Sequence, residues 1–80
     1  MTETQFDILE WLNDLIMAEN GIPITSNNVL GSSELDSFGY TVFFVDIYDK
    51  YECYSRDELK ELSIPDIPII NIINRIESCM

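Results

Sequence analysis

The sequence predicts an all-α fold, a four-helix bundle with three long helices and a short helix third in order. Apolar residues recur at helical spacing in three stretches, and residues that cap helices precede them. Stretches rich in Asn, Ser, Gly and Pro separate the expected helices. With 80 residues the chain forms one small domain, residues 1–80, which buries only about 60% of its unfolded surface.

The first helix is expected to begin at Thr2 or Thr4. Thr2 and Gln5 fit a capping box, in which two side chains satisfy each other's free backbone N–H groups, and Thr4 with Asp7 is a looser match. Placed at about 100° per residue, most apolar side chains of the segment fall on one arc, which should face the core. This arc consists of Ile8, Leu9, Trp11, Leu12, Leu15 and Ile16. The other side holds the polar residues Asp7, Glu10, Asn13 and Asp14, with Phe6 and Met17 as exceptions.

A long polar loop is expected after this helix. Asn20-Gly21 supplies a left-handed helix stop, and Pro23 keeps the helix from resuming. The loop then extends from Gly21 to Glu34, a length that is uncommon in a compact domain and usually marks a functional loop. The alternative is an ordinary connector. Aliphatic residues indicate that the loop is held across the bundle, namely Ile22, Ile24, Val29 and Leu30.

The run from Gly39 to Tyr51 predicts the second long helix, because it contains no proline and is too long for one strand. Ser37 then lies in the first turn, where free backbone N–H groups and the positive end of the helix dipole favour a phosphate. The alternative is that Asp36 or Ser37 only caps the helix, as both residue types often do.

This second helix has two apolar faces. One arc is assigned to the core and consists of Tyr40, Phe43, Phe44, Ile47 and Tyr51. The opposite arc holds Phe38, Val42, Val45 and Asp49, with Asp46 beside it. A surface helix normally has a polar outer face, so these five residues form a candidate docking surface next to Ser37. The alternative is a helix that is buried on most of its sides.

The short third helix is expected to begin after Ser55. Ser55 and Glu58 fit a capping box that opens a helix running to about Leu62. Its acidic residues should form a solvated face, namely Asp57, Glu58 and Glu61.

The last helix has two candidate starts. Ser63 and Asp66 form a box-like pair, but Pro68 would then break the helix interior. With Asp66 as the cap, Pro68 falls in the first turn, and we favour this later start. One apolar arc should follow, made of Ile69, Ile70, Ile72, Ile73 and Ile76, opposite Asn71, Asn74 and Arg75.

The charge balance limits the partners. Fifteen acidic residues against four basic ones give a net charge of −11, so nucleic acid and anionic membranes are poor partners. A basic surface on another protein is a good one. No apolar run is long enough to span a bilayer, and the N-terminus lacks the basic and apolar regions of a signal peptide. We therefore expect a cytoplasmic protein.

The residue types argue against catalysis by this chain. There is no histidine, the commonest general base and metal ligand, so we expect neither catalytic residues nor a metal site. A hydrolase built on Ser37 would lack its base. Cys53 and Cys79 do not have metal-ligand spacing and are interpreted as free thiols, with an intermolecular or redox role for either as the alternative.

Asp36-Ser37-Phe38 resembles the Asp-Ser-Leu signature of acyl and peptidyl carrier proteins, and it stands at the expected helix start behind a long loop. The order of the helices resembles the fold of that family over essentially all 80 residues. The resemblance implies a stand-alone carrier with 4′-phosphopantetheine attached to Ser37. The terminal thiol of this arm would hold an acyl or aminoacyl group as a thioester.

The resemblance also implies partners. A phosphopantetheinyl transferase would use the Ser37 hydroxyl as the acceptor, and Asp36 would help to place the divalent metal ion and the substrate in that complex. An acyl or aminoacyl ligase and downstream biosynthetic enzymes would bring basic surfaces to the docking surface named above. The carrier is expected to act as a monomer.

Three residues depart from the pattern of fatty-acid carriers. Phe38 replaces the usual leucine, and Gly39 weakens the first helical turn by roughly 1 kcal/mol relative to alanine. Val42 stands where many fatty-acid carriers have a glutamate that docks basic enzymes. These departures favour a specialised carrier, in a secondary-metabolite or dedicated-ligase pathway. The alternative function is a small acidic adaptor that docks a basic partner through the same surface and needs no serine at position 37.

Overall fold

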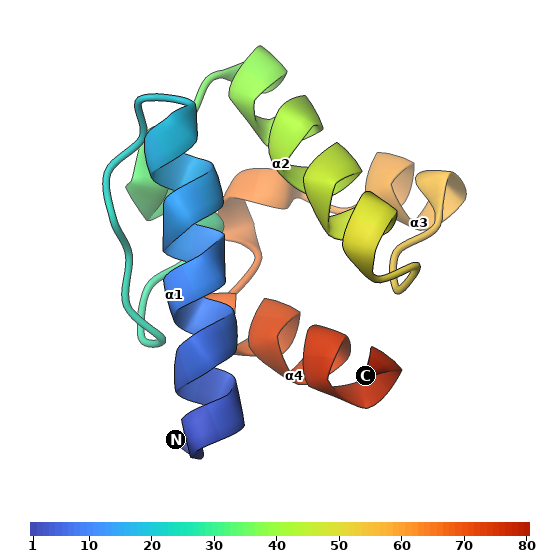
Figure 1. Cartoon of the computed structure of the whole chain (residues 1–80). Helices are drawn as coiled ribbons and strands as arrows, with labels where there is room; N and C mark the ends of the chain where they lie inside the picture. The colour runs from blue at the N-terminus through green and yellow to red at the C-terminus, as the bar shows by residue number, and fades with distance from the viewer.

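Four α-helices and two short 3₁₀ helices (η1 and η2) make up the structure, a computed structural model that describes residues 1–80 (Figure 1). The elements in chain order are α1 (Glu3–Ala18), η1 (Leu30–Ser33), α2 (Ser37–Lys50), α3 (Arg56–Glu61), η2 (Ile64–Asp66) and α4 (Ile69–Cys79). There are no strands, and one isolated antiparallel bridge joins Val29 to Pro68. The Cα radius of gyration, 11.4 Å, matches the ~12 Å expected for a compact domain of this length. The all-α prediction with a short third helix is confirmed.

α1 begins after Thr2, and the predicted capping box is present. Gln5 N donates to Thr2 Oγ1 at 3.2 Å, while Thr2 N donates to Gln5 Oε1 at 3.0 Å. The side-chain nitrogen of Gln5, Nε2, also donates to the side chains of Asn74 and Glu77 in α4. Gln5 therefore completes the capping box of α1 and also ties this helix to α4.

α1 ends in a Schellman motif built by two residues with different roles. Asn20 adopts the left-handed conformation with φ 63°, and its N–H donates to Met17 O at 3.1 Å. Gly21 N donates to Ile16 O at 2.9 Å, with a negative φ. Gly21 is needed for space, because a Cβ there would lie 2.5 Å from Ile16 Cγ2 and 2.8 Å from Leu35 Cδ2. The predicted stop is correct, with Asn20 as its left-handed residue.

One hydrophobic cluster joins three of the four helices. α1 packs against both α4 and α2 (Figure 1). The predicted core arcs supply most of the cluster, and α3 supplies none of its buried residues. The buried members are Ile8, Leu12, Ile16, Ile24, Leu30, Leu35, Phe43, Phe44, Ile47, Cys53, Tyr54, Ile67, Ile69, Ile72, Ile73 and Ile76.

The long loop after α1 is held across the bundle, as predicted, but by more than its aliphatic residues. Ile24 and Leu30 are buried, whereas Ile22 and Val29 are exposed. Asn13 of α1 makes two hydrogen bonds to the backbone of Ile24: its Nδ2 donates to Ile24 O at 3.0 Å, and Ile24 N donates to its Oδ1 at 2.8 Å. Asn13 is therefore an anchor of the loop and not merely part of a polar face.

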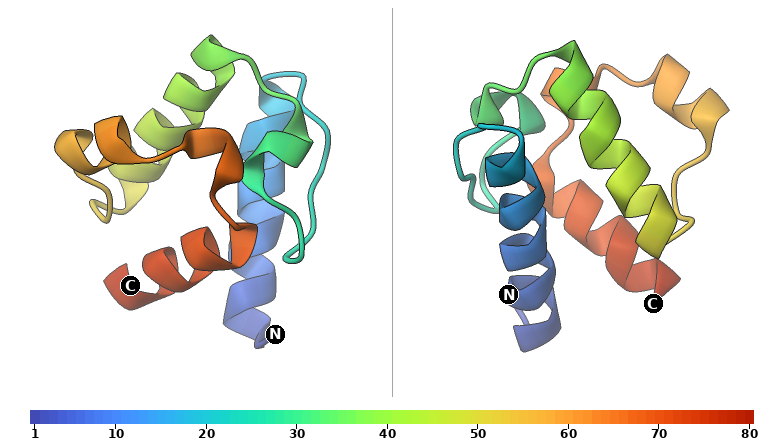
Figure 2. Two further views of the ribbon diagram at one scale, coloured as in Figure 1. Left: turned by 180° about the vertical axis from the view of Figure 1, so that it is seen from behind. Right: turned by 45° about the horizontal axis from the view of Figure 1, so that its top comes forward.

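A second set of contacts ties the loop to the segment before α4. Leu30 N donates to Ile67 O at 2.8 Å, and Ile69 N donates to Asn28 O at 2.9 Å. η1 and η2 are in contact, and a Cβ on Gly31 would lie 2.9 Å from Pro65 O. Figure 2 shows from behind how these two short segments lie side by side. The end of the loop is therefore fixed immediately before α2 begins.

The expected start of the last helix is wrong. Asp66 does not cap α4, which begins at Ile69 with Pro68 in the N-cap position. Asp66 instead closes η2, where its Oδ2 accepts a hydrogen bond from Ser63 Oγ at 2.8 Å. Ile67 precedes a proline and is extended, since such a residue is disfavoured in helical conformation. The isoleucines of the predicted apolar arc are buried, apart from the half-buried Ile70.

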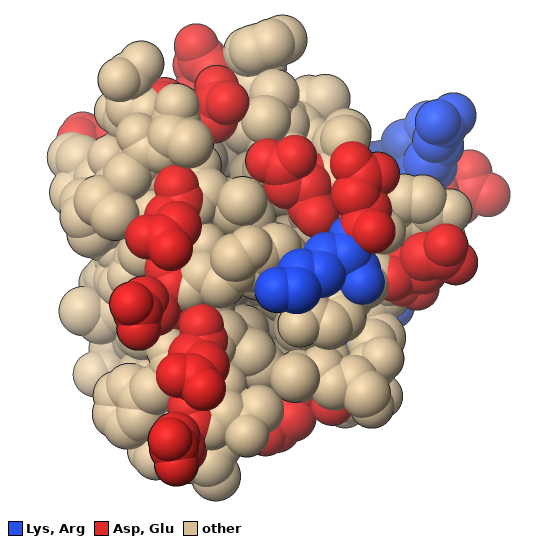
Figure 3. Space-filling view, in the orientation of Figure 1, with Lys and Arg blue, Asp and Glu red and all other residues tan.

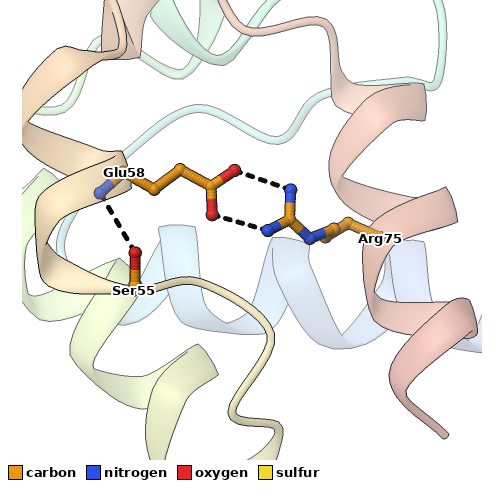
Figure 4. Close-up of polar contacts among 3 residues, drawn as sticks. All are labelled: Ser55, Glu58 and Arg75. Atoms are coloured by element: carbon orange, nitrogen blue, oxygen red, sulfur yellow. Dashed lines mark hydrogen bonds and ion pairs between the residues drawn. The ribbon is translucent and has the colours of Figure 1, made fainter.

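α3 is held at the edge of the bundle by few contacts. Ser55 caps it by accepting from Glu58 N at 3.1 Å, as half of the predicted capping box. The Glu58 side chain does not complete the box, because both of its oxygens accept hydrogen bonds from Arg75 of α4 (Figure 4). The expected solvated face is correct for Asp57 and Glu61, which are exposed, and wrong for this paired glutamate.

Candidate functional site

The start of α2 presents an exposed serine behind a capping acid. Asp36 is the N-cap residue, and its Oδ1 accepts a hydrogen bond from Gly39 N at 2.7 Å. Ser37 is the first helical residue, and its side chain is exposed. The capping role is thus taken by Asp36, which leaves the Ser37 hydroxyl free of any hydrogen bond within the chain.

Two backbone N–H groups at this helix start have no partner in the protein. The N–H groups of Gly39 and Tyr40 bind the side chain and the carbonyl oxygen of Asp36. Those of Ser37 and Phe38 make no hydrogen bond within the chain. They lie at the positive end of the α2 dipole, where free N–H groups favour an anion such as phosphate.

Gly39 has a packing reason to be a glycine. A Cβ at this position would lie 3.2 Å from both Cβ and Cδ2 of Leu35, and 3.3 Å from Asp36 Oδ1. Leu35 is buried in the core directly before the cap. The glycine therefore lets the buried leucine and the capping carboxylate pack closely against the first turn of α2, which offsets part of its unfavourable helix propensity.

The predicted docking surface divides into two parts. Phe38 is 71% exposed and Val45 51% exposed, whereas Val42 and Asp46 are half-buried. Val45 and Asp49 line a cleft between α2 and α3, and the other three residues lie outside it. Phe38, which directly follows Ser37, is the most exposed apolar side chain of the docking surface.

The cleft beside Ser37 was not anticipated from the sequence. Ser37, Thr41 and Tyr48 of α2 line one side of it, and Leu59 and Leu62 at α3 contribute apolar side chains. The residues on the α2 side recur at helical spacing, between the two faces that the sequence analysis singled out. What the sequence did not reveal is the position of α3, which forms the other wall (Figure 2).

Charge is distributed unevenly over the molecule. Residues 1–49 contain nine acidic and no basic residues, and all four basic residues occur between Lys50 and Arg75. Figure 3 shows a column of acidic side chains along α1, while the basic side chains in this view lie nearer its middle and right, with acidic side chains beside them. Lys50 Nζ lies 4.8 Å from the ring centroid of Trp11 in α1. Ser37 belongs to the half of the sequence without basic residues, but the cleft that it lines also includes Arg56 and Arg75. Acidic side chains attract basic groups, and salt screens that attraction.

No side-chain cluster suited to binding a metal ion is present, and none of the helices has both the length and the apolar character needed to cross a bilayer. Comparison of the chain with protein-family models, with curated proteins and with solved structures finds no match.

Proposed function

We propose that this chain is a stand-alone carrier protein in which Ser37 is the attachment point of 4′-phosphopantetheine. The observation that carries the proposal is an exposed serine hydroxyl without a partner at the first position of α2. Its neighbour Asp36 already serves as the cap, so the serine is not needed for that purpose. The order of the helices and the long first loop agree with the carrier fold that the sequence resembles.

The residues present fit such a group. A phosphodiester on Ser37 would lie beside the free N–H groups of Ser37 and Phe38, which can donate to its oxygens. The carboxylate of Asp36 repels that negative charge. One of its oxygens, Oδ1, already accepts a hydrogen bond from Gly39 N, and the free N–H groups at the helix start oppose the repulsion. When bound, the arm supplies a thiol that carries an acyl or aminoacyl group as a thioester.

The cleft between α2 and α3 offers a place for part of such an arm or its cargo. Ser37 lines it, and apolar side chains from both walls face it, among them Val45, Leu59 and Leu62. Contact with these side chains would remove apolar parts of a cargo from water. We therefore propose a cargo with an apolar portion, in a specialised biosynthetic pathway.

Partners would approach the start of α2. The exposed Phe38 supplies an apolar contact beside the serine, and the acidic half of the chain favours enzymes with basic surfaces. These enzymes would be a phosphopantetheinyl transferase, a ligase that loads the cargo and enzymes that use the loaded carrier. We propose that the chain itself is not an enzyme.

The test is incubation of the purified protein with coenzyme A and several broad-specificity phosphopantetheinyl transferases, followed by intact-mass measurement. The proposal expects one phosphopantetheinyl group per chain. An unchanged mass with every transferase, while an established carrier is modified in parallel, would count against it.

A second candidate function is an acidic adaptor that binds a basic partner through the outer face of α2. The exposure of Phe38 and Val45 favours it, because neither side chain is needed for the core. An adaptor would not accept phosphopantetheine, so the same mass measurement separates the two functions.

A further inference from the structure

We infer that Cys53 and Cys79 form a site of reversible oxidation, at which an intramolecular disulfide joins the end of α4 to the segment that connects α2 and α3. Both residues are free cysteines, one buried and one exposed. The inference does not depend on the proposed function of Ser37.

The fold brings the two segments together although they are distant in sequence. Figures 1 and 2 show the C-terminal end of α4 beside the connection that follows α2. The Arg75 guanidinium lies over the ring of Tyr54, with Cζ 4.8 Å from the ring centroid. Cys79 follows Arg75 by one helical turn and shares its face of α4, and Cys53 directly precedes Tyr54.

The two side chains also influence one another. After burial, the Cys79 side chain is the next cause that raises the pKa of the Cys53 thiol. Cys53 belongs to the same hydrophobic cluster as Ile76, which is fully buried on α4 one turn before the helix ends. A bond between the two sulfur atoms would therefore join segments that the native packing already brings together. One sulfur lies in the terminal turn of a helix, and helix ends fray, so this turn can adjust to the geometry that a disulfide requires.

The two thiols differ in reactivity. Burial, reinforced by the Cys79 side chain, raises the pKa of the Cys53 thiol to about 11. Cys79 is exposed at the end of the helix. A thiolate is the attacking species in disulfide exchange, and access to it controls the rate. Cys79 is thus the residue that an external oxidant reaches first, and Cys53 resolves the product.

A small-molecule disulfide such as oxidised glutathione completes the chemistry. The Cys79 thiolate attacks one glutathione sulfur and releases the first glutathione thiol, leaving a mixed disulfide on Cys79. The Cys53 thiolate then attacks the Cys79 sulfur and releases the second glutathione thiol. Two protein thiols lose two electrons, the glutathione disulfide gains them, and the two protons end on the glutathione thiols.

The bond would close a loop that contains the whole of α3. α3 forms one wall of the cleft, and few contacts hold it to the bundle. Closing a loop of this length restricts the unfolded chain, so the oxidised form should melt roughly 10 °C or more above the reduced form. Oxidation would thereby restrain α3, the wall of the cleft that has no buried residue to hold it.

The experiment uses the Ser37→Ala protein, so that Cys53 and Cys79 are the only thiols whatever is attached at position 37. We expect oxidised glutathione to yield a monomer lighter by two hydrogens, with no free thiol. Its melting temperature should rise, and a reducing agent should reverse the change. Cys79→Ser alters only an exposed residue and should abolish both effects. A stable glutathione adduct on Cys79 with Cys53 unreacted, or a disulfide-linked dimer, would overturn the inference.

Discussion

Arg75 of α4 donates to both carboxylate oxygens of Glu58 in α3, at 2.7 and 2.5 Å, across seventeen residues of sequence. The two planar groups meet in the bidentate geometry that arginine and carboxylate favour (Figure 4). α3 buries no side chain completely, so this ion pair and the half-buried Leu59 are prominent among its attachments to the bundle. Both partners are partly exposed, and salt should weaken the pair.

The ion pair predicts a pH dependence of stability. Hydrogen bonding to Arg75 holds the pKa of Glu58 below its usual value of 4.5. A depressed pKa in the folded state means that the stabilisation is fully present above the unfolded pKa and is lost as the pH falls through the folded pKa. Melting temperatures of wild type and Glu58→Gln should therefore differ at neutral pH and converge in acid.

The matched control for this prediction is Asp57→Asn, which removes the charge of the exposed neighbour on the same helix. It should leave the pH dependence of stability close to that of wild type. A constant difference between wild type and Glu58→Gln from neutral pH to about pH 3 would mean that the ion pair does not contribute.

Two phenylalanines of α2 test the assignment of its faces. Phe43 is fully buried in the cluster, and truncation to alanine should lower the free energy of unfolding by about 3–5 kcal/mol. Phe38 is 71% exposed, and Phe38→Ala should change stability by less than about 0.5 kcal/mol. Denaturant titration measures both changes. Similar effects of the two truncations would show that the faces are assigned wrongly.

Asn13 should stabilise the domain through the long loop. Its two hydrogen bonds satisfy both backbone groups of the buried Ile24, so Asn13→Ala should cost about 1–3 kcal/mol. The control is Asn71→Ala on α4, whose exposed side chain makes no hydrogen bond within the chain. Equal melting temperatures for the two variants would show that the loop does not depend on this anchor.

The features that the sequence predicted correctly are those with local causes. Thr2 and Gln5 are one helical turn apart, and Asn20 stands directly at the helix end, so adjacent residues determine both structures. The core face of α2 followed from periodicity, and the place of Ser37 in the first turn followed from the start of the apolar run after it. These signals need no knowledge of other elements.

The features that were missed depend on distant residues. Asn13 was interpreted as part of a polar face because its partner, Ile24, lies in a loop whose path no local pattern specifies. The pairing of Glu58 with Arg75, and with it the cleft, depends on where α3 lies against α4. Asp66 was mistaken for a cap because a 3₁₀ turn closed by Ser63 uses the same residue types as a capping box.

Phe38 should be important for modification of the serine beside it. If transferases contact the start of α2, Phe38→Ala should lower the kcat/KM for phosphopantetheine transfer by about tenfold or more. The reason is that truncating an apolar side chain at the centre of an interface removes much of its binding energy. Phe6→Ala is the matched control, because Phe6 is 56% exposed but lies on α1 away from the serine. Equal rates for both variants would exclude Phe38 from the contact.

The central claim is that Ser37 accepts phosphopantetheine, and intact mass after transferase treatment tests it most directly. Wild type and Thr41→Ala, which removes an exposed hydroxyl one turn further along the same cleft, should each gain one phosphopantetheinyl group. Ser37→Ala should gain none while its helix content stays unchanged by circular dichroism. Modification of Ser37→Ala, or a wild-type protein that stays unmodified, would contradict the account.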